Sequence, residues 1–140
     1  IGANVLLPKK GNVFISIKDE DKENILILSK TLIELGYKIF ATSGTSKKLN
    51  ENNIASYEIK KVYEGRPNIV DMMLSGEINL VINTVEGVKS IEDSFSLRQT
   101  ALMNNIPYYT TTQGANAVIS AMKSVKNKRI KVKSLQSYFD

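Results

Sequence analysis

The sequence predicts an α/β fold, a three-layer α/β/α sandwich whose central sheet has five parallel strands. Short apolar runs of about five residues, rich in β-branched and aromatic side chains, alternate with longer segments of helical period. The 140 residues fit one domain with a core of its own. Because strands alternate with helices, we expect a parallel sheet covered on both faces, with right-handed crossovers.

Five apolar runs are predicted to be strands: residues 13–17 (VFISI), 38–42 (KIFAT), 56–59 (SYEI), 80–84 (LVINT) and 107–111 (PYYTT). Between the first two, apolar residues recur at spacings of three and four from Ile25 to Leu35, and Gly36 is predicted to end this helix. Further helices are expected at residues 45–52, 68–75, 91–104 and 116–125.

The composition excludes several kinds of chemistry. The chain has no Cys and no His, which removes disulfides, thiolate nucleophiles, zinc fingers and imidazole acid–base catalysis. The apolar runs are too short to span a membrane. The absence of Cys fits a reducing cytoplasm, which is the expected location. The start, IGANVLLPKKG, resembles no signal peptide, so we expect residues 1–140 to be one domain in which 1–10 are a linker from an absent upstream region.

The net charge of +5 is concentrated at one end of the chain. Residues 1–122 carry 13 basic and 13 acidic side chains, whereas the remainder carries six basic residues and Asp140. Such a basic C-terminal tail, residues 126–140, can attract phosphate backbones. No aromatic platform accompanies it, so a solvated surface is the favoured interpretation and nucleic acid is not expected as a partner.

Lys22 stands in the first turn of the helix after the first strand, within KDEDKEN. A cation there opposes the helix dipole by a few tenths to about 1 kcal/mol. The neighbouring residues Asp19, Glu20, Asp21 and Glu23 can neutralise this cost. Alternatively, Lys22 and the free N–H groups of the helix share an anion.

The segment TSGT, residues 42–45, stands at the end of the second predicted strand. Gly44 can adopt a positive φ and admit a ligand to the backbone, and Thr42 and Thr45 offer hydroxyls, with Thr45 able to cap the next helix. The spacing of a Walker A loop is absent. Taken alone, this segment favours an ordinary helix cap over an anion site, and Lys47 and Lys48 behind it are expected to be merely solvent-exposed.

The third strand is followed by Lys60, Lys61 and Arg66 around a Gly-Arg-Pro turn. A phosphate needs such groups, because Arg makes forked contacts and Lys acts as a point charge. Surface pairing with Glu64 or Asp71 explains them equally well.

The fourth strand brings Asn83 and Thr84 to the same edge, and the fifth ends in three threonines, 110–112, before the next helix. Ligands of open parallel sheets bind outside the carboxyl ends of the strands, near the point where the strand order reverses. These polar groups would suit a phosphorylated small molecule there. No paired carboxylate or base is placed for chemistry, so binding is better supported than turnover.

Three segments together resemble a known family: residues 16–54, 61–84 and 90–117. The resemblance is to the methylglyoxal synthase-like domain at the C-terminus of the carbamoyl phosphate synthetase large subunit, and it covers residues 9–125. Its most specific piece is EGRPNIVDMMLSGEINLVINT. The resemblance implies the same five-stranded parallel sheet and a regulatory, non-catalytic domain.

Members of that family bind effectors, typically UMP as inhibitor and IMP as activator. The resemblance implies that the effector phosphate is held by a set of residues from four strand ends: Lys22, Thr42, Gly44, Thr45, Lys61 and Asn83. Ornithine, which activates some members, would contact Tyr108 and Thr110, and Thr84 and Arg66 are further candidate contacts. Some members place a hydroxyl where this chain has Val85, which leaves the identity of the effector open.

The resemblance also implies a parent enzyme, an ATP-dependent ligase that makes carbamoyl phosphate from glutamine-derived ammonia and bicarbonate. Its partners would be the other synthetase domains of the same chain and a glutaminase small subunit. No cofactor or metal is expected in this domain, whereas the parent chain would use ATP with Mg²⁺ or Mn²⁺. A role in pyrimidine or in arginine synthesis stays open.

Three alternatives stand beside this hypothesis. Methylglyoxal synthase is a phosphate lyase with a catalytic Asp in a Gly-Asp segment and an active-site His, and this chain has neither. The IMP cyclohydrolase module carries a GRVKTLHP-like segment where this chain has GRPNIVDM. The third alternative is a nucleic-acid-binding module that uses the basic tail.

Overall fold

The computed structural model describes residues 11–18, 22–84 and 87–139, and within these ranges five parallel strands form one sheet. The strand order is β3-β2-β1-β4-β5. The strands are β1 (Gly11–Ser16), β2 (Tyr37–Ala41), β3 (Tyr57–Glu58), β4 (Leu80–Asn83) and β5 (Tyr108–Tyr109). The predicted five-stranded parallel α/β architecture is therefore confirmed, although each strand ends one or two residues earlier than expected.

The sheet has its topological switch point between β1 and β4. The chain moves outward from β1 through β2 to β3 and then returns to the other side of β1 for β4 and β5. In the register, Ile15 pairs with Ala41 of β2, and Ser16 pairs with Asn83 of β4. The residues that follow β2 and β4 therefore flank the end of the central strand.

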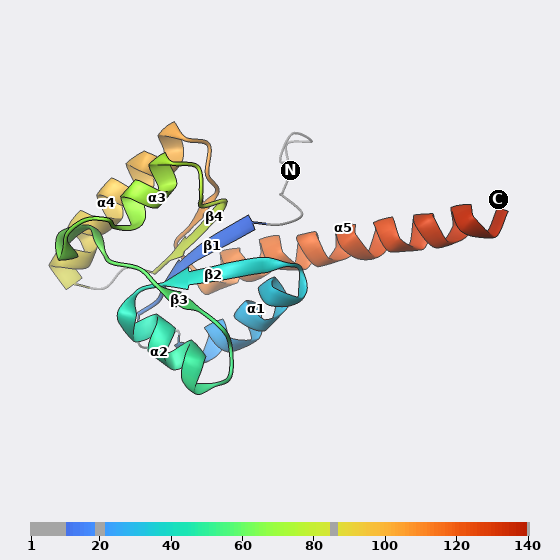
Figure 1. Cartoon of the computed structure of the whole chain (residues 1–140), viewed down its shortest axis with the longest axis horizontal. Helices are drawn as coiled ribbons and strands as arrows, with labels where there is room; N and C mark the ends of the chain where they lie inside the picture. The colour runs from blue at the N-terminus through green and yellow to red at the C-terminus, as the bar shows by residue number, and fades with distance from the viewer. Residues whose placement is uncertain (1–10, 19–21, 85–86, 140) are drawn as a thin grey trace.

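Helices cover both faces of the sheet (Figure 1). One face packs against α1 (Lys22–Glu34), α2 (Ser43–Glu51) and α5 (Thr112–Phe139), and the other against α3 (Ile69–Leu74) and α4 (Gly87–Met103). Alternate residues of β1 point to opposite faces of the sheet. Ile15 packs on the face covered by α1, α2 and α5, and Phe14 packs on the face covered by α3 and α4. A short 3₁₀ helix, η2 (Val62–Glu64), precedes α3.

The boundaries of several helices differ from the sequence prediction. Helix α2 begins at Ser43, so its N-cap is Thr42 and the expectation that Thr45 caps it was wrong. Helix α4 begins four residues earlier than expected, at Gly87. The end of α1 agrees with prediction, since Gly36 follows it with a φ of 97°.

Helix α5 continues far beyond residue 125, so residues 126–139, expected as a tail, are helical. No Gly or Pro occurs after Gly114, and nothing in the sequence interrupts the helix. Its second half extends past the sheet (Figure 1), and Lys126 Nζ donates to the carbonyl of Glu34 at 3.1 Å. No helix in the described part of the chain is long and apolar enough to cross a membrane.

Candidate functional site

Two threonine hydroxyls hold the end of the central strand from opposite sides. Beyond its last paired residue, the N–H of Ile17 donates to Thr45 Oγ1 at 3.2 Å, and the N–H of Lys18 donates to Thr84 Oγ1 at 2.7 Å. A hydroxyl that accepts a hydrogen bond keeps its own hydrogen to donate. Thr45 and Thr84 are therefore ordered by the backbone directly after β1 and can each offer an O–H to a ligand at this edge.

The N-terminus of α2 lies beside these hydroxyls. Thr42 is its N-cap, with φ −68° and ψ 161°, yet it makes no side-chain cap hydrogen bond. Its hydroxyl lies 3.4 Å from Ser16 Oγ and 3.5 Å from Thr45 Oγ1 instead. The first-turn N–H groups of α2 thus receive no side-chain acceptor from their N-cap, which is the arrangement in which a helix N-terminus binds an anion.

Gly44 contributes differently from expectation. It lies in the first turn of α2, whereas the glycines with positive φ in the described part of the chain are Gly36, Gly65 and Gly76. The predicted left-handed conformation was therefore wrong. Gly44 is exposed, so its missing side chain still leaves the helix N-terminus open to a ligand.

Asn83 lies on the other side of β1 and is 4% exposed. Its Nδ2 donates to Ser94 Oγ at 2.7 Å and to the Tyr108 hydroxyl at 2.8 Å. The guanidinium carbon of Arg98 lies 5.3 Å from the centre of the Tyr108 ring. Asn83, from β4, is thus bonded to α4 and β5.

Sequence reasoning missed Ser94 and Arg98. Ser94 occupies the buried stripe of α4 together with Leu97 and Ala101, at spacings of three and seven. A polar residue within an apolar stripe was the signal that could have found it. Arg98 carried no such signal, because its contact depends on the position of β5.

The two lysines of the predicted site are placed by their backbones. Lys22 begins α1, as expected, and its side chain lies outside the described residues, as does Val85. Lys61 follows β3 and is the N-cap of η2, with a half-buried side chain. Its N–H donates to Glu64 Oε1 at 2.7 Å. Both lysines thus follow strands at the same edge of the sheet.

Arg66 forms the surface ion pair that the sequence left as one interpretation. Its Nη2 lies 2.6 Å from Asp71 Oδ1 and its side chain is 80% exposed. The hydrogen bond and charge of Asp71 raise the pKa of Arg66, while the hydrogen bonds from Arg66 and from the N–H of Asn68 lower the pKa of Asp71. This guanidinium is held by Asp71, in the first turn of α3.

The threonines after β5 have separate positions. Thr111 Oγ1 accepts from the N–H of Gly114 at 3.0 Å and so caps α5. Thr112 is buried, whereas Thr110 is exposed at the same edge.

Lys48 forms an ion pair with Glu23, whereas the sequence predicted only solvent exposure. Its Nζ lies 2.5 Å from Glu23 Oε1, and this hydrogen bond raises the pKa of Lys48. The pair joins α2 to the first turn of α1, beside Lys22. Lys47 is exposed, as expected.

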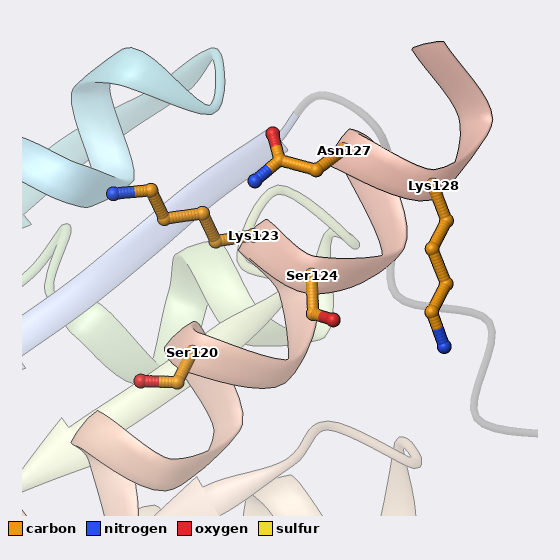
Figure 2. Close-up of a pocket in the computed structure, with 5 residues that line it drawn as sticks. All are labelled: Ser120, Lys123, Ser124, Asn127 and Lys128. Carbon is orange, nitrogen blue, oxygen red and sulfur yellow. The ribbon is translucent and has the colours of Figure 1, made fainter. Parts of the chain in front are cut away.

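A hollow of about 390 Å³ lies elsewhere, on α5. The described residues that line it are Ser120, Lys123, Ser124, Asn127 and Lys128. Figure 2 shows Lys123 and Lys128 pointing in different directions, so their charges do not converge on one ligand. Helix α5 runs back from the end of β5 to the end of α1. This hollow therefore lies at the opposite edge of the sheet from Thr45 and Thr84.

The family of the chain follows from its match to a family model. Residues 24–110 match the model described as MGS-like domain. The chain belongs to the MGS-like domain family. This MGS-like domain is 46% identical over 140 residues to the carbamoyl phosphate synthase large chain of Rhizobium meliloti (strain 1021), a match that covers 100% of this chain and 12% of that relative.

It is also 45% identical over 145 residues to the carbamoyl phosphate synthase large chain, C-terminal section, of Aquifex aeolicus (strain VF5), covering 100% of this chain and 27% of that relative. The MGS-like domain therefore spans a small part of the length of these relatives. The resemblance stated from the sequence is confirmed at the level of the family.

Two solved structures share the fold. Methylglyoxal synthase from Elizabethkingia anophelis NUHP1 superposes with a TM-score of 0.63 at 15% identity, covering 81% of this chain and 80% of that one. ForH superposes with a TM-score of 0.57 at 14% identity, over the same shares. At these identities the likeness shows the fold alone.

Proposed function

We propose that this MGS-like domain is the regulatory domain of a carbamoyl phosphate synthase large chain and binds a nucleoside monophosphate, UMP or IMP, at the carboxyl ends of its strands. The observation that carries the proposal is the pair of hydroxyls, Thr45 and Thr84, ordered by the consecutive N–H groups of the two residues that follow β1. Both can donate toward the point at which the strand order reverses, which is where open parallel sheets bind ligands.

The chemistry of this edge favours a phosphate. The N-terminus of α2 presents first-turn N–H groups without a side-chain cap, and its dipole favours an anion there. Lys22 at the start of α1 and Lys61 after β3 would add positive charge. Hydrogen bonds from such groups to a charged oxygen are roughly twice as strong as neutral ones.

A regulatory role requires that the ligand bind two states of the parent enzyme unequally, since equal affinity shifts no equilibrium. The ligase reaction, with ATP and Mg²⁺ or Mn²⁺, would then belong to other parts of the cytoplasmic parent chain. Those parts and a glutaminase small subunit are the proposed partners. Ornithine, near Tyr108 and Thr110, is a second proposed effector.

A thermal-shift series with UMP, IMP, ornithine and uridine tests this proposal. A nucleotide at about 100 times its dissociation constant adds roughly 2.7 kcal/mol of stability, whereas uridine lacks the phosphate and should add far less. The variant Thr84→Val should weaken the response, and Thr31→Val, whose hydroxyl bonds within α1, is its matched control. Absence of a shift with either nucleotide at millimolar concentration would sink the assignment.

The fold shared with methylglyoxal synthase calls for an activity test as well. Dihydroxyacetone phosphate is incubated with the protein, and methylglyoxal is assayed. We expect none, because the chain has no His and no Gly-Asp segment. Sustained turnover would replace the regulatory proposal with a lyase.

The basic part of α5 is the remaining competitor, because Lys123, Lys126 and Lys128 are exposed. We expect no salt-dependent gel shift with RNA or DNA. A shift abolished by deleting residues 123–140 would establish nucleic-acid binding by α5.

A further inference from the structure

We infer that one face of α5 is a docking surface for an acidic part of the same polypeptide, in the ligase portion of the parent large chain. This α5 docking face is defined by the five described residues that line the hollow on the helix: Ser120, Lys123, Ser124, Asn127 and Lys128. The docking face rests on the proposed function, because it needs a parent chain, and it adds the place at which the domain meets that chain.

Helix α5 carries an unbalanced positive charge. Its 28 residues include six basic side chains and no Asp or Glu. Lys123 and Lys128 are exposed, and neither forms an ion pair within the described part of the chain. Lys123 stands three residues before Lys126, and Lys128 stands three before Lys131, a spacing at which like charges destabilise a helix. An acidic partner would supply the compensating negative charge.

The described residues of α5 beyond Met122 lack the packing that normally holds a helix. Ala115, Ile119 and Met122 are buried in the core between α5 and the sheet. Residues 123–128 are all exposed, and the helix continues to Phe139 past the sheet (Figure 1). Because most of the stability of a helix in a protein comes from packing of one face, this segment is best supported by a partner that covers it.

Lys126 fixes the direction in which α5 leaves the sheet. Its Nζ donates to the carbonyl of Glu34, the last residue of α1, at 3.1 Å. Helix α1 has no basic residue in its own last turn, so Lys126 supplies the cation that C-terminal carbonyls favour. Lys123 and Lys128 lie on either side of this anchor along the helix. The docking face is therefore oriented before any partner binds, which lowers the entropic cost of docking.

The spread of the polar groups favours a protein surface with several carboxylates over a small anion. Figure 2 shows Lys123 and Lys128 pointing in different directions, so separate carboxylates can each meet one lysine. The hollow of about 390 Å³ can admit side chains of the partner, and Val125, 43% exposed, adds an apolar contact. Residues 120–128 contain no Arg and no aromatic residue, the types that commonly contact nucleic-acid bases.

The weakness of exposed ion pairs favours a partner in the same polypeptide. Each such pair contributes little, so this face would bind a free protein weakly. A short tether raises the effective concentration of the partner to the millimolar range, at which a weak contact is occupied. The relative from Rhizobium meliloti (strain 1021) has the length to supply one, because the match to this chain covers 12% of it.

Hydrogen exchange of α5 tests the docking face, in the full-length large chain that contains this domain and in residues 1–140 alone. We expect the amides of residues 126–139 to exchange about tenfold more slowly in the large chain, because docking holds the helix closed. The double variant Lys123→Glu with Lys128→Glu should abolish that difference by repelling the acidic partner. The control variant, Lys30→Glu with Lys38→Glu, makes the same charge change at two other exposed lysines and should preserve the difference.

The same double variant separates docking from a purely structural role of the two lysines. In residues 1–140 alone, the new glutamates stand three residues before Lys126 and Lys131 and replace repulsion with attraction. The amides of α5 should therefore exchange about two- to fivefold more slowly than in the unchanged protein. In the large chain the variant should make them exchange faster. A change of the same sign in both proteins would mean that the charges act only within α5, and the docking face would be wrong.

Zero-length cross-linking of amines to carboxylates identifies the occupant. Cross-links from Lys123 or Lys128 to Asp or Glu elsewhere in the same large chain support the docking face. Their yield should fall several-fold when the salt concentration is raised from about 0.05 to about 0.5 M, because salt screens exposed charges. Absence of these cross-links, together with an RNA or DNA gel shift that the double variant abolishes, would assign the face to nucleic acid and overturn the docking face.

The outcomes distinguish the docking face from the proposed function. If UMP or IMP stabilises the domain but α5 exchanges equally fast in both proteins, the docking face is wrong and the proposed function stands. If neither nucleotide binds while α5 is protected and cross-linked in the large chain, the docking face stands as a contact between domains and the regulatory role fails.

Discussion

The segments that follow β2 and β4 lie on the two sides of strand β1, and each holds the backbone at the end of β1 with a threonine hydroxyl. They differ in the other polar groups that they carry. On the β2 side, a contiguous turn supplies a buried hydroxyl, Thr45, and the N-terminus of α2. On the β4 side, Asn83 is held by side chains from α4 and β5, which are 11 and 25 residues away along the chain. The first side presents a helix N-terminus and a hydroxyl suited to an anion, and the second combines the Thr84 hydroxyl with an amide whose NH₂ group is already bonded. On the β2 side, the groups suited to an anion come from one short stretch of sequence. On the β4 side, the orientation of the Asn83 amide depends on contacts with α4 and β5.

The largest effect is expected on the β2 side, from Thr45→Val. This variant leaves the N–H of Ile17 without its acceptor in a buried position, which should lower the free energy of unfolding by about 1–3 kcal/mol. Urea denaturation measures this change. Thr42→Val is the matched control, because the Thr42 hydroxyl makes only contacts of 3.4 and 3.5 Å. Equal stability of the two variants would mean that Thr45 does not anchor β1.

Thr84→Val tests the β4 side and should cost less. The N–H of Lys18 loses Thr84 Oγ1, but Lys18 is half-buried and water can replace the acceptor, so we expect about 0.5–1.5 kcal/mol. Hydrogen exchange of the Lys18 amide reports the same bond directly. A larger loss than in Thr45→Val would reverse the ranking of the two sides.

Much of the fold could be predicted because its signals are local. Short apolar runs rich in β-branched and aromatic residues predicted the strands, and Gly36 correctly marked the end of α1. The strand ends were predicted too late because threonines such as Thr42 and Thr84 favour strands, yet here their side chains bond to the neighbouring segments. The length of α5 was missed because a basic, polar segment looks like a solvated tail, although it contains no helix breaker.

The candidate site was predicted only in part, because only some of its contacts join residues that are close in sequence. Thr42 and Thr45 adjoin one another in sequence and lie together in the structure, where Thr45 turned out to bond to β1 and not to cap α2. The bond between Asn83 and Tyr108 depends on β4 and β5 being neighbours, and the involvement of Ser94 depends on the rotation of α4. No pattern within a single segment contains this information.

The variant Arg66→Met tests whether the segment after β3 contributes a ligand contact to the site. Because the guanidinium of Arg66 is held by Asp71, Arg66→Met should leave the affinity for UMP within about twofold. The pKa of Asp71 is lowered in the folded state, so the pair stabilises the fold above the usual pKa of 3.8, and this contribution is lost as the pH falls through the folded-state pKa. Denaturation below about pH 4 should therefore be less pH-dependent in Asp71→Asn. A large loss of UMP affinity in Arg66→Met would make Arg66 a ligand contact.

The smallest effect is expected for the pair Glu23 and Lys48, which joins α1 to α2 outside the buried site. The pKa of Lys48 is raised by Glu23, so the contribution of the pair is complete below the usual pKa of 10.5 and is lost only as the pH rises through the folded-state value. At neutral pH, Lys48→Glu should change UMP affinity by about twofold or less, since Glu23 is 76% exposed and solvent screens the pair.

The double variant Glu23→Lys with Lys48→Glu should restore that affinity. Lys47→Glu makes the same charge change at an exposed neighbour and so measures the long-range field alone. If Lys48→Glu weakens UMP more than about tenfold, Lys47→Glu does not, and the swap fails to rescue binding, then Lys48 itself contacts the phosphate. The phosphate-binding part of the site would in that case extend from the turn after β2 along α2 to Lys48. The β2 side would then differ from the β4 side in charge as well as in its hydrogen-bonding groups.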